Sequence, residues 1–388
     1  MGIPRSVVVS ALLTTGSLLF VLYILSFKGL LMLIHSWMKS LRNRLADSRR
    51  DSRRSRRAFV VSRAIDTLEP RTLLSAISVT SNLDTIDAGD GVTTLREAII
   101  ESNSGGIENT ISFGIPATSS RTIVLTSGKL PVITNEVEID GSGQNVVIDS
   151  LGLSLPTDSH VLQINGAGAS NSSVHDLTFV NTPFAISTTD SSNLTFENIG
   201  ADWIGPTRVG DALLIDGGGD HTVRNVSVSN RSKGIVLIDV TDSLIEKNIG
   251  HNTSVGGQGV SGRNTYLEND FSGSTVLAAI GLFGSVGQNI VKDNNLSGSG
   301  IGVQVRGSLG NQIVDNNLSG SSLSVVNAPI VVEDDTQIMI SGNDFTNSRR
   351  GIQFFGFQDI VITSGTSSTA GYDAASNTLT IDVDLSTV

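Results

Sequence analysis

The chain has 388 residues, a net charge of −11, 41 glycines and no cysteine. The lack of cysteine excludes disulfides, cysteine-bound zinc, iron–sulfur centres and a thiol nucleophile, and the high glycine content argues against a coiled coil or helical bundle. Residues 1–71 carry a charge of +9 and residues 72–388 a charge of −20. The acidic part lacks the clustered Lys and Arg that a phosphate backbone requires, so we expect no nucleic acid partner.

An uncharged apolar run, residues 7–27, opens the chain and is long enough to cross a bilayer. An Arg-rich stretch with ten Lys or Arg follows within residues 39–63, and the positive-inside rule would keep it in the cytoplasm. Alternatively, translation begins at Met32 or Met38 and the basic stretch opens an export signal. We therefore expect residues 1–38 to be a hydrophobic membrane anchor or a mis-assigned extension.

Residues 68–76, LEPRTLLSA, directly follow the basic stretch. They resemble the LEPR-type motif that precedes large exported and cell-surface proteins of planctomycete bacteria, with matches at Leu68, Glu69, Pro70, Arg71, Leu73, Leu74 and Ser75. The resemblance implies that residues 39–76 are a basic, disordered sorting segment. We expect the protein to be extracellular or at the cell surface, and membrane-anchored if residues 7–27 are retained.

A short helix is expected near residue 95. Thr94 can cap it and Glu97 can return a bond to the cap, while Gly105 and Gly106 end it. One apolar face is formed by Leu95, Ala98, Ile99 and Ser102. Residues 77–105 resemble the CSLREA-type module of many secreted parallel β-helix proteins, with Thr93 and Thr94 where the family has Cys and Ser. We expect residues 77–115 to cap an open stack of strands.

From residue 116 onward the sequence repeats a unit of Asn or Asp, a large apolar residue, and Ser, Thr or Gly. The units begin at Asp176, Asn198, Asn225, Asn248, Asp270, Asn295, Asn317 and Asp344, with a mean interval of 24 residues. Two or three short strands fill each interval, which leaves no room for a crossover helix and is too short for a propeller blade. A leucine-rich repeat is excluded because its Leu ladder is missing. The pattern predicts an all-β parallel solenoid.

Stacked coils should bring like residues into rows. The residue before the repeated Asn or Asp gives a partial ladder of Asn269, Asn294, Asn316 and Asn343, continued by His175, Glu197, Arg224 and Lys247 in the earlier coils. We expect these asparagines to adopt the left-handed bend of a corner. The next residue gives an inward apolar row of Leu177, Ile199, Val226, Ile249, Phe271, Leu296, Leu318 and Phe345.

These rows resemble the right-handed parallel β-helices of the pectin-lyase-like superfamily, and the handedness comes from that resemblance. Residues 116–365 would hold roughly ten coils at a rise of about 4.8 Å each. Residues 366–388 are expected to form a hairpin that closes or continues the stack.

The candidate catalytic residues are Asp211, Asp216 and Asp239, in a region that resembles part of the pectate lyases and polygalacturonases. Asp216 and Asp239 each precede the Asn of their coil by nine residues, so we expect them to stack about 4.8 Å apart and to hold calcium or share a proton. Candidate ligand-binding residues around them are Trp203, Arg208, His221 and Arg224, with Asp190 completing the patch. The complete signatures of both enzyme families are absent.

Two functions remain open from the sequence. The first is a non-catalytic exported or surface-attached β-helix, serving as an adhesion, envelope or matrix component. The second is a carbohydrate-active lyase or hydrolase for acidic polysaccharide. The acidic surface of the protein would repel such a polysaccharide unless calcium bridges the protein and the polymer. The expected partners are accordingly a polysaccharide or envelope component, and the membrane through residues 7–27.

Overall fold

The computed structural model describes residues 75–105, 109–151, 153, 160–203, 210–251, 253–275, 278–284, 286–321, 328–333, 337–348 and 350–355, and the backbone of 359–365, 369–373 and 378–384. The chain divides into two units, Met1–Arg71 and Thr72–Val388. The first unit lies outside the described residues, and with it the apolar run, the basic stretch and most of the LEPR-like motif. Within the described ranges, no helix is long and apolar enough to span a membrane.

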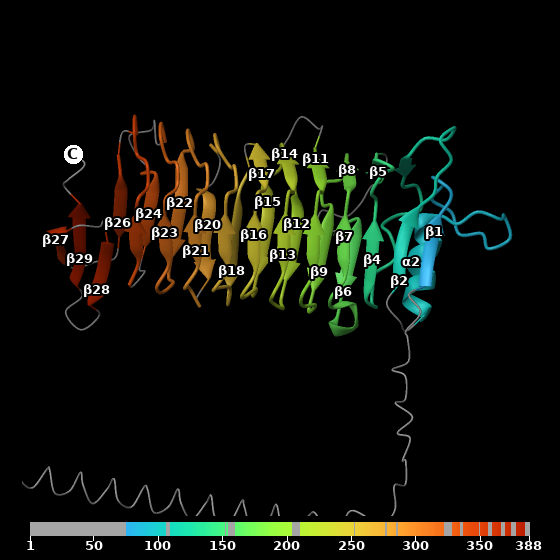
Figure 1. The fold of residues 1–388 in the computed structure, drawn as a ribbon, viewed down its shortest axis with the longest axis horizontal. Helices are drawn as coiled ribbons and strands as arrows, with labels where there is room; N and C mark the ends of the chain where they lie inside the picture. The colour runs from blue at the N-terminus through green and yellow to red at the C-terminus, as the bar shows by residue number, and fades with distance from the viewer. Residues whose placement is uncertain are drawn as a thin grey trace, which may run out of the picture. The chain divides into compact units, whose positions relative to one another are not determined.

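The second unit is a parallel β-solenoid, as the repeat predicts (Figure 1). Its coils build three sheets, called A, B and C here, with eleven, six and nine strands in the described residues. All strand pairs within these sheets are parallel. A typical coil passes from sheet A to sheet B to sheet C, and the predicted fold class of roughly ten coils is confirmed.

The strands of the three sheets have the following bounds. Sheet A contains β1 (Ser75–Val79), β2 (Asn109–Phe113), β4 (Val137–Asp140), β7 (Ser173–His175), β10 (Thr195–Glu197), β13 (Thr222–Arg224), β16 (Leu244–Glu246), β19 (Thr265–Leu267), β21 (Ile290–Lys292), β23 (Gln312–Val314) and β25 (Met339–Ser341). Sheet B contains β3 (Thr122–Val124), β5 (Val146–Asp149), β8 (Leu177–Val180), β11 (Gly200–Asp202), β14 (Ser227–Ser229) and β17 (Ile249–His251). Sheet C contains β6 (Leu162–Asn165), β9 (Ile186–Thr189), β12 (Asp211–Asp216), β15 (Lys233–Ile238), β18 (Val255–Gly259), β20 (Ala278–Gly284), β22 (Ile301–Arg306), β24 (Ile330–Glu333) and β26 (Ile352–Phe355), and a 3-10 helix η1 (Ala167–Ala169) follows β6.

Burial alternates along the strands, because one face of each sheet points into the solenoid. In sheet C the paired residues Ile215 and Leu237 are both buried, and so are Leu282 and Val305 further along the stack. The buried apolar side chains form one cluster that runs from Ile77 to Ile340. Because the chain has no cysteine, this continuous apolar core stabilises the solenoid without disulfides.

The corner between sheets A and B changes phase within the stack. Its left-handed residues are Asp176, Asn198 and Asn225 in earlier coils, and Lys247, Glu268, Asp293 and Asp315 in later ones. Because Ser227 pairs with Ile249, Asn248 lies level with Val226 and not with Asn225. The predicted alignment is therefore wrong by one residue at Asn248. It is wrong by two residues from Asp270 onward, because Ile249 pairs with Asp270. Ile249, expected inward, is 44% exposed.

Stacked asparagines occupy the later corners. The side-chain oxygen of Asn269 accepts hydrogen bonds from the backbone N–H and the side-chain Nδ2 of Asn248, at 3.0 and 2.9 Å. The same pair of bonds recurs along Asn269, Asn294, Asn316 and Asn343. Level with this ladder the earlier coils place Leu177, Ile199 and Val226, not His175, Glu197 and Arg224. The left-handed bend also lies one residue before each ladder asparagine, which corrects the expected reason for their use.

A second ladder, which sequence analysis did not identify, follows the corner from sheet C to sheet A. The backbone N–H of Asn264 donates to Oδ1 of Asn289, and that of Asn289 donates to Oδ1 of Asn311, both at 3.0 Å. Each of these residues stands five positions before a member of the first ladder. The recurring Asn-x4-Asn spacing was the available signal.

The predicted capping helix is confirmed as α2 (Leu95–Gly105), whose buried residues are Leu95, Arg96, Ala98, Ile99 and Ser102. The backbone N–H of Thr94 donates to Oε2 of Glu97 at 2.8 Å, and the N–H of Glu97 donates to Oγ1 of Thr94 at 3.2 Å. This reciprocal capping box supports the start of the helix. In Figure 1 the helix lies at the β1 end of the stack.

An ion pair that sequence analysis missed ties this cap to the first coils. Arg96 and Asp84 are only 7% and 4% exposed, and their side chains lie 2.8 Å apart. The other oxygen of Asp84 accepts the backbone N–H groups of Thr126 and Ser127 at 2.7 and 2.8 Å. Both charges are thus paired and hydrogen-bonded, as buried charges must be.

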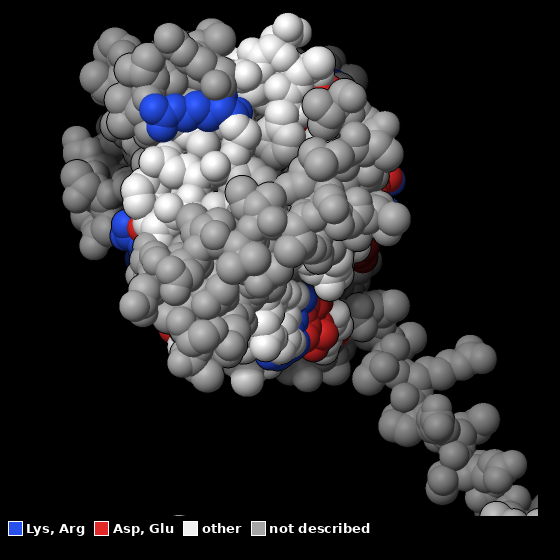
Figure 2. All heavy atoms as spheres, turned by 90° about the vertical axis from the view of Figure 1, so that its left-hand side faces the viewer, with Lys and Arg blue, Asp and Glu red and all other residues white. Residues whose placement is uncertain are grey.

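A separate three-stranded sheet follows β26. Strand β29 (Thr378–Asp384) pairs antiparallel with β28 (Thr369–Asp373) and in parallel with β27 (Asp359–Gly365). Figure 1 places it at the opposite end of the stack from α2. In the view onto that end, the described atoms are mostly neither acidic nor basic (Figure 2).

Candidate functional site on the outer face of sheet C

The outer face of sheet C contains a shallow groove over β15, β18, β20 and β22. Its lining residues are Lys233, Ile235, Val236, Ser254, Val255, Gly256, Gln258, Ala278, Gly281, Phe283 and Gln304. The groove encloses about 430 Å³, a volume that includes space open to solvent. Neighbouring coils supply its residues at matching levels, so the solenoid itself assembles the site.

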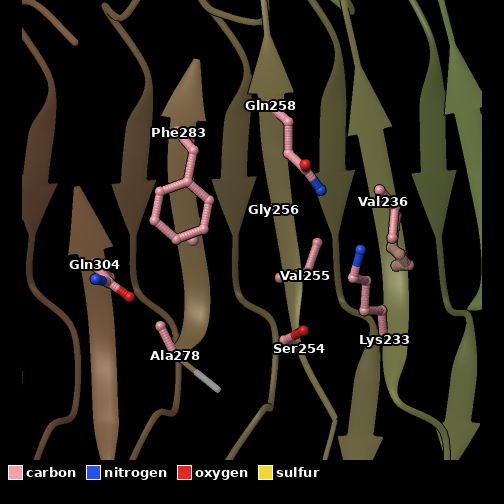
Figure 3. Close-up of a pocket in the computed structure, with 11 residues that line it drawn as sticks. Lys233, Val236, Ser254, Val255, Gly256, Gln258, Ala278, Phe283 and Gln304 are labelled. Carbon is pink, nitrogen blue, oxygen red and sulfur yellow. The ribbon is translucent and has the colours of Figure 1, made fainter. Parts of the chain in front are cut away.

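Two glycines form the floor of the groove. Val236, Gly256, Gly281 and Gln304 pair in register across four strands, so the middle of this row has no side chains. A Cβ on Gly256 would collide with the carbonyl oxygen of Gly281, and a Cβ on Gly281 would lie 2.7 Å from the ring of Phe283. Glycine at these positions therefore lets the Phe283 ring lie over its own strand (Figure 3).

The groove combines an aromatic ring with amide, hydroxyl and amine groups. Phe283 is 39% exposed and pairs in register with Gln258. Figure 3 shows Gln258 on the strand next to that of Phe283, Lys233 on the strand beyond Gln258, and Gln304 on the strand at the other side of Phe283. Nε2 of Gln304 donates to Oε1 of Glu333 at 3.1 Å, which orients the amide. None of the eleven lining residues is a carboxylate.

The predicted carboxylates Asp216 and Asp239 lie at the edge of the same sheet, but not in register. Asp216 ends β12 and pairs with Ile238, and Asp239 is the next residue along. Burial raises the pKa of Asp216, and the nearby charges of Asp239 and Asp190 raise it further. The structure thus brings the three charges within interaction range, while the expected stacking of Asp216 on Asp239 is wrong by one residue.

Asp239 also performs a structural role at its corner. Its backbone is left-handed, with φ 55°, and its Oδ1 accepts the backbone N–H of Val260 in the next coil at 2.6 Å. Gly259 of that coil passes so close that a Cβ there would collide with the Asp239 carboxylate. Asp315 and Gly342 repeat the arrangement. An aspartate at this corner is therefore a turn residue first.

Asp211 begins β12 beside two basic residues. Burial raises the pKa of Asp211, and the charges of Lys233 and Arg231 oppose that rise. Arg231, which sequence analysis did not select, is fully buried, and burial lowers its pKa to about 10. It donates to the carbonyl oxygens of Ala201, Pro183 and Asp211 and to the hydroxyl of Thr182. Arg231 therefore fastens the connection between sheets B and C.

The predicted ligand-binding residues do not assemble around these aspartates. His221 is 1% exposed, with Nδ1 accepting the N–H of Leu194 and Nε2 lying 3.3 Å from the carbonyl oxygen of Gly217, so its expected place in a surface patch is corrected. Arg224 lies on sheet A, where it pairs with Glu197 at 2.7 Å. Trp203 is half-buried directly after β11 in sheet B, and Arg208 lies outside the described residues.

The described residues contain one cluster with three metal-ligand atoms within 4.8 Å of one another. It consists of Asp140, His175 and Asp176, and it includes neither Asp216 nor Asp239. In the described part of the chain the predicted calcium ligands Asp216 and Asp239 thus form no such three-residue cluster. Asp239 already uses one oxygen for the Val260 backbone.

Sequence analysis did not find the groove. The signals were Val-Gly-Gly-Gln-Gly at residues 255–259 and Gly-Leu-Phe-Gly at residues 281–284. These segments read as irregular strands, because glycine weakens a strand. Only the register shows that Gly256 and Gly281 are level with each other.

Residues 142–330, just under half of the chain, match the family model described as periplasmic copper-binding protein (NosD). The match runs from β5 to the start of β24 and includes the whole groove. No curated protein matches the chain.

The solved structures that are similar to the chain include three carbohydrate-active enzymes. The endo-xylogalacturonan hydrolase from Aspergillus tubingensis has a TM-score of 0.49 and 15% identity, over 72% of this chain and 95% of that one. The catalytic domain of a GH87 α-1,3-glucanase in complex with nigerose has a TM-score of 0.44 and 13% identity, over 74% and 60%. The A-module of the Azotobacter vinelandii mannuronan C-5 epimerase AlgE6 has a TM-score of 0.43 and 16% identity, over 73% and 94%. These identities are too low to carry an activity over to this chain.

Proposed function

We propose that the protein is an exported or cell-surface β-helix that binds a polysaccharide on sheet C without cleaving it. The observation that carries this proposal is the groove, where the exposed Phe283 ring lies beside the amides of Gln258 and Gln304. An aromatic ring packs against the apolar face of a sugar, while amides and hydroxyls bond to its hydroxyl groups. Because the groove follows the solenoid axis across four strands, it suits an extended polymer.

Export is supported by the sequence and by the family match. The matching family is described as periplasmic, and the LEPR-like and CSLREA-like segments resemble those of exported proteins. In this proposal residues 1–38 and 39–76 serve anchoring and sorting. Residues 77–115, which include α2 and also contribute β2 to sheet A, cap one end of the solenoid, and the sheet of β27, β28 and β29 closes the other. The partner is then an envelope or matrix polysaccharide.

The test is a binding assay of the full chain against a panel of neutral, uronate and sulfated polysaccharides. We expect at least one polymer to bind, and Phe283→Ala to weaken that binding at least tenfold. Phe355→Ala is the matched control, because Phe355 is an exposed phenylalanine of the same sheet, 47% exposed, outside the groove. Equal binding by Phe283→Ala and the unmodified chain would refute the proposed face.

A second candidate is a carbohydrate-active enzyme, which the raised pKa of Asp216 favours. A carboxyl group whose pKa is raised by burial and by the charges of Asp239 and Asp190 resembles the acid of a polysaccharide lyase or hydrolase. Calcium held by Asp216 and Asp239 would let this acidic surface approach an acidic polysaccharide. The same panel of polysaccharides, assayed for product with and without calcium, distinguishes the two functions. Turnover that is abolished in Asp216→Asn would favour the enzyme over the non-catalytic binding protein.

A further inference from the structure

The outer face of sheet A has a histidine surrounded by carboxylates. This cluster lies at β4 and β7, in earlier coils than the groove and on a different sheet. Asp140 ends β4 and pairs directly with His175, which ends β7, and Asp176 follows at the corner. Nδ1 of His175 lies 3.0 Å from Oδ2 of Asp176 and 3.4 Å from Oδ1 of Asp140. All three residues are half-buried.

We propose that Asp140, His175 and Asp176 form a binding site for a divalent transition-metal ion. Metal–nitrogen and metal–oxygen bonds are about 2.0–2.2 Å long, so two ligands on one ion are separated by about 3.0 Å at a right angle and about 3.4 Å at the tetrahedral angle. The two distances from Nδ1 match these separations. The two distances from Nδ1 thus fit one shared ion, and the ligand atoms of all three residues lie within 4.8 Å of one another.

The other ring nitrogen supports the same assignment. Nε2 of His175 lies 3.3 Å from Oε1 of Glu138, two residues before Asp140 on β4. A metal-bound histidine typically donates its second N–H to a carboxylate, which fixes the tautomer and the ring orientation. With its proton on Nε2, His175 presents the lone pair of Nδ1 to the two aspartates.

Both aspartates are themselves held by backbone or side-chain donors. The N–H of Ser142 donates to Oδ1 of Asp140 at 2.8 Å, and Nδ2 of Asn198 donates to Oδ1 of Asp176 at 3.2 Å. Oδ2 of Asp176, the atom nearest to the ring, is not the one that Asn198 holds. Ligands oriented in this way lose little freedom on binding the metal.

The ligand set selects the class of metal. One imidazole nitrogen with two carboxylates suits Zn²⁺, Mn²⁺, Co²⁺ or Ni²⁺, whereas Ca²⁺ and Mg²⁺ are bound by oxygen ligands. Half-burial leaves coordination positions for water, as in an exchangeable site. This inference does not depend on polysaccharide binding, because it uses a different sheet and different residues.

The first test is Zn²⁺ titration of the full chain by calorimetry in a non-chelating buffer. We expect one ion per chain, loss of that binding in His175→Gln, and at least tenfold weaker binding in Asp140→Asn. His251→Gln is the matched control, because His251 is exposed on sheet B and stands outside the cluster. Circular dichroism checks that each variant retains its β structure.

A second measurement separates an ion site from a simple ion-pair cluster around a protonated histidine. With Co²⁺, the visible spectrum of the chain should show ligand-field bands that His175→Gln lacks. Glu138→Gln should bind Zn²⁺ about 10–100-fold more weakly, as expected for the residue that orients the ligand. Absence of Zn²⁺ binding, or unchanged binding in His175→Gln, would overturn the proposal.

Discussion

Asn248 begins the corner ladder, and its Oδ1 accepts the backbone N–H of Val226 at 2.9 Å. Asn248 is in register with Val226, a buried apolar residue of the preceding coil. From this point onward, side-chain amides supply acceptors to the backbone of the preceding coil. The change from apolar to amide corners explains the phase shift at this position.

The ladder predicts a large stability cost for losing one rung. Asn294 accepts two bonds from Asn269 and donates to Tyr266 and Asn316, all in the buried interior. Asn294→Ala leaves buried donors and acceptors unsatisfied, so we expect a loss of about 2–4 kcal/mol, measured by urea denaturation. Asn295→Ala is the adjacent control, and because Asn295 is only half-buried, water can replace its bonds at a cost below about 1 kcal/mol. Equal costs for the two variants would contradict the ladder's role.

The buried pair of the cap predicts a second stability effect. Arg96→Met would leave the Asp84 carboxylate buried without its charge partner, and we expect the protein to lose about 3–5 kcal/mol. Adding Asp84→Asn to this variant removes the stranded charge and should restore part of the loss. Thermal unfolding of both variants measures this, with half-buried Arg121→Met as the control. A double variant less stable than Arg96→Met would argue against a stranded charge.

The raised pKa of Asp216 predicts that the stability difference between Asp216→Asn and the unmodified chain depends on pH. The pKa of Asp216 in the folded chain lies above the ordinary value of an aspartate, so folding disfavours its charged form. The contribution of Asp216 to stability therefore falls as pH rises from about 4 through the folded-state pKa. Asp216→Asn should be more stable than the unmodified chain at pH 7, and the difference should vanish at pH 3. Melting temperatures at both pH values measure it, and a less stable Asp216→Asn at pH 7 would contradict the repulsion from Asp239 and Asp190.

The glycine floor predicts a variant that affects binding more than stability. A methyl group on Gly281 would meet the ring of Phe283, which can rotate away, rather than a fixed backbone atom. We therefore expect Gly281→Ala to weaken polysaccharide binding several-fold with a stability change of about 1 kcal/mol or less. Gly351→Ala, where the added methyl meets nothing within 4 Å, is the control. Unchanged polysaccharide binding by Gly281→Ala would indicate that the polysaccharide does not bind in the groove.

Much of the fold could be predicted because the solenoid repeats its chemistry. Corner asparagines and inward apolar residues recur about every 24 residues, and the Thr94–Glu97 capping box is a local signal. The phase shift escaped detection because a polar residue followed by an apolar one occurs on both sides of it. The first residue of the unit is the bend at Asn225, the ladder member at Asn248 and the residue after the ladder from Asp270 onward.

The site was harder to predict, since it depends on which outward residues share a level. Asp216 and Asp239 have equal distances to their repeat units, yet the units are themselves out of register beyond Asn225. The groove needs Gly256, Gly281 and Phe283 to be considered together, across coils that a strand pattern treats separately. Arg231 gave no signal, because its partners are mainly backbone carbonyl oxygens.

The most direct measurement is a crystal structure of the full chain with an oligosaccharide taken from the polymer that binds. A sugar ring against Phe283, between Gln258 and Gln304 and with its glycosidic bonds intact, is the predicted result. A sugar bound at Asp216 and Asp239 with a cleaved bond, or bound away from sheet C, would contradict it.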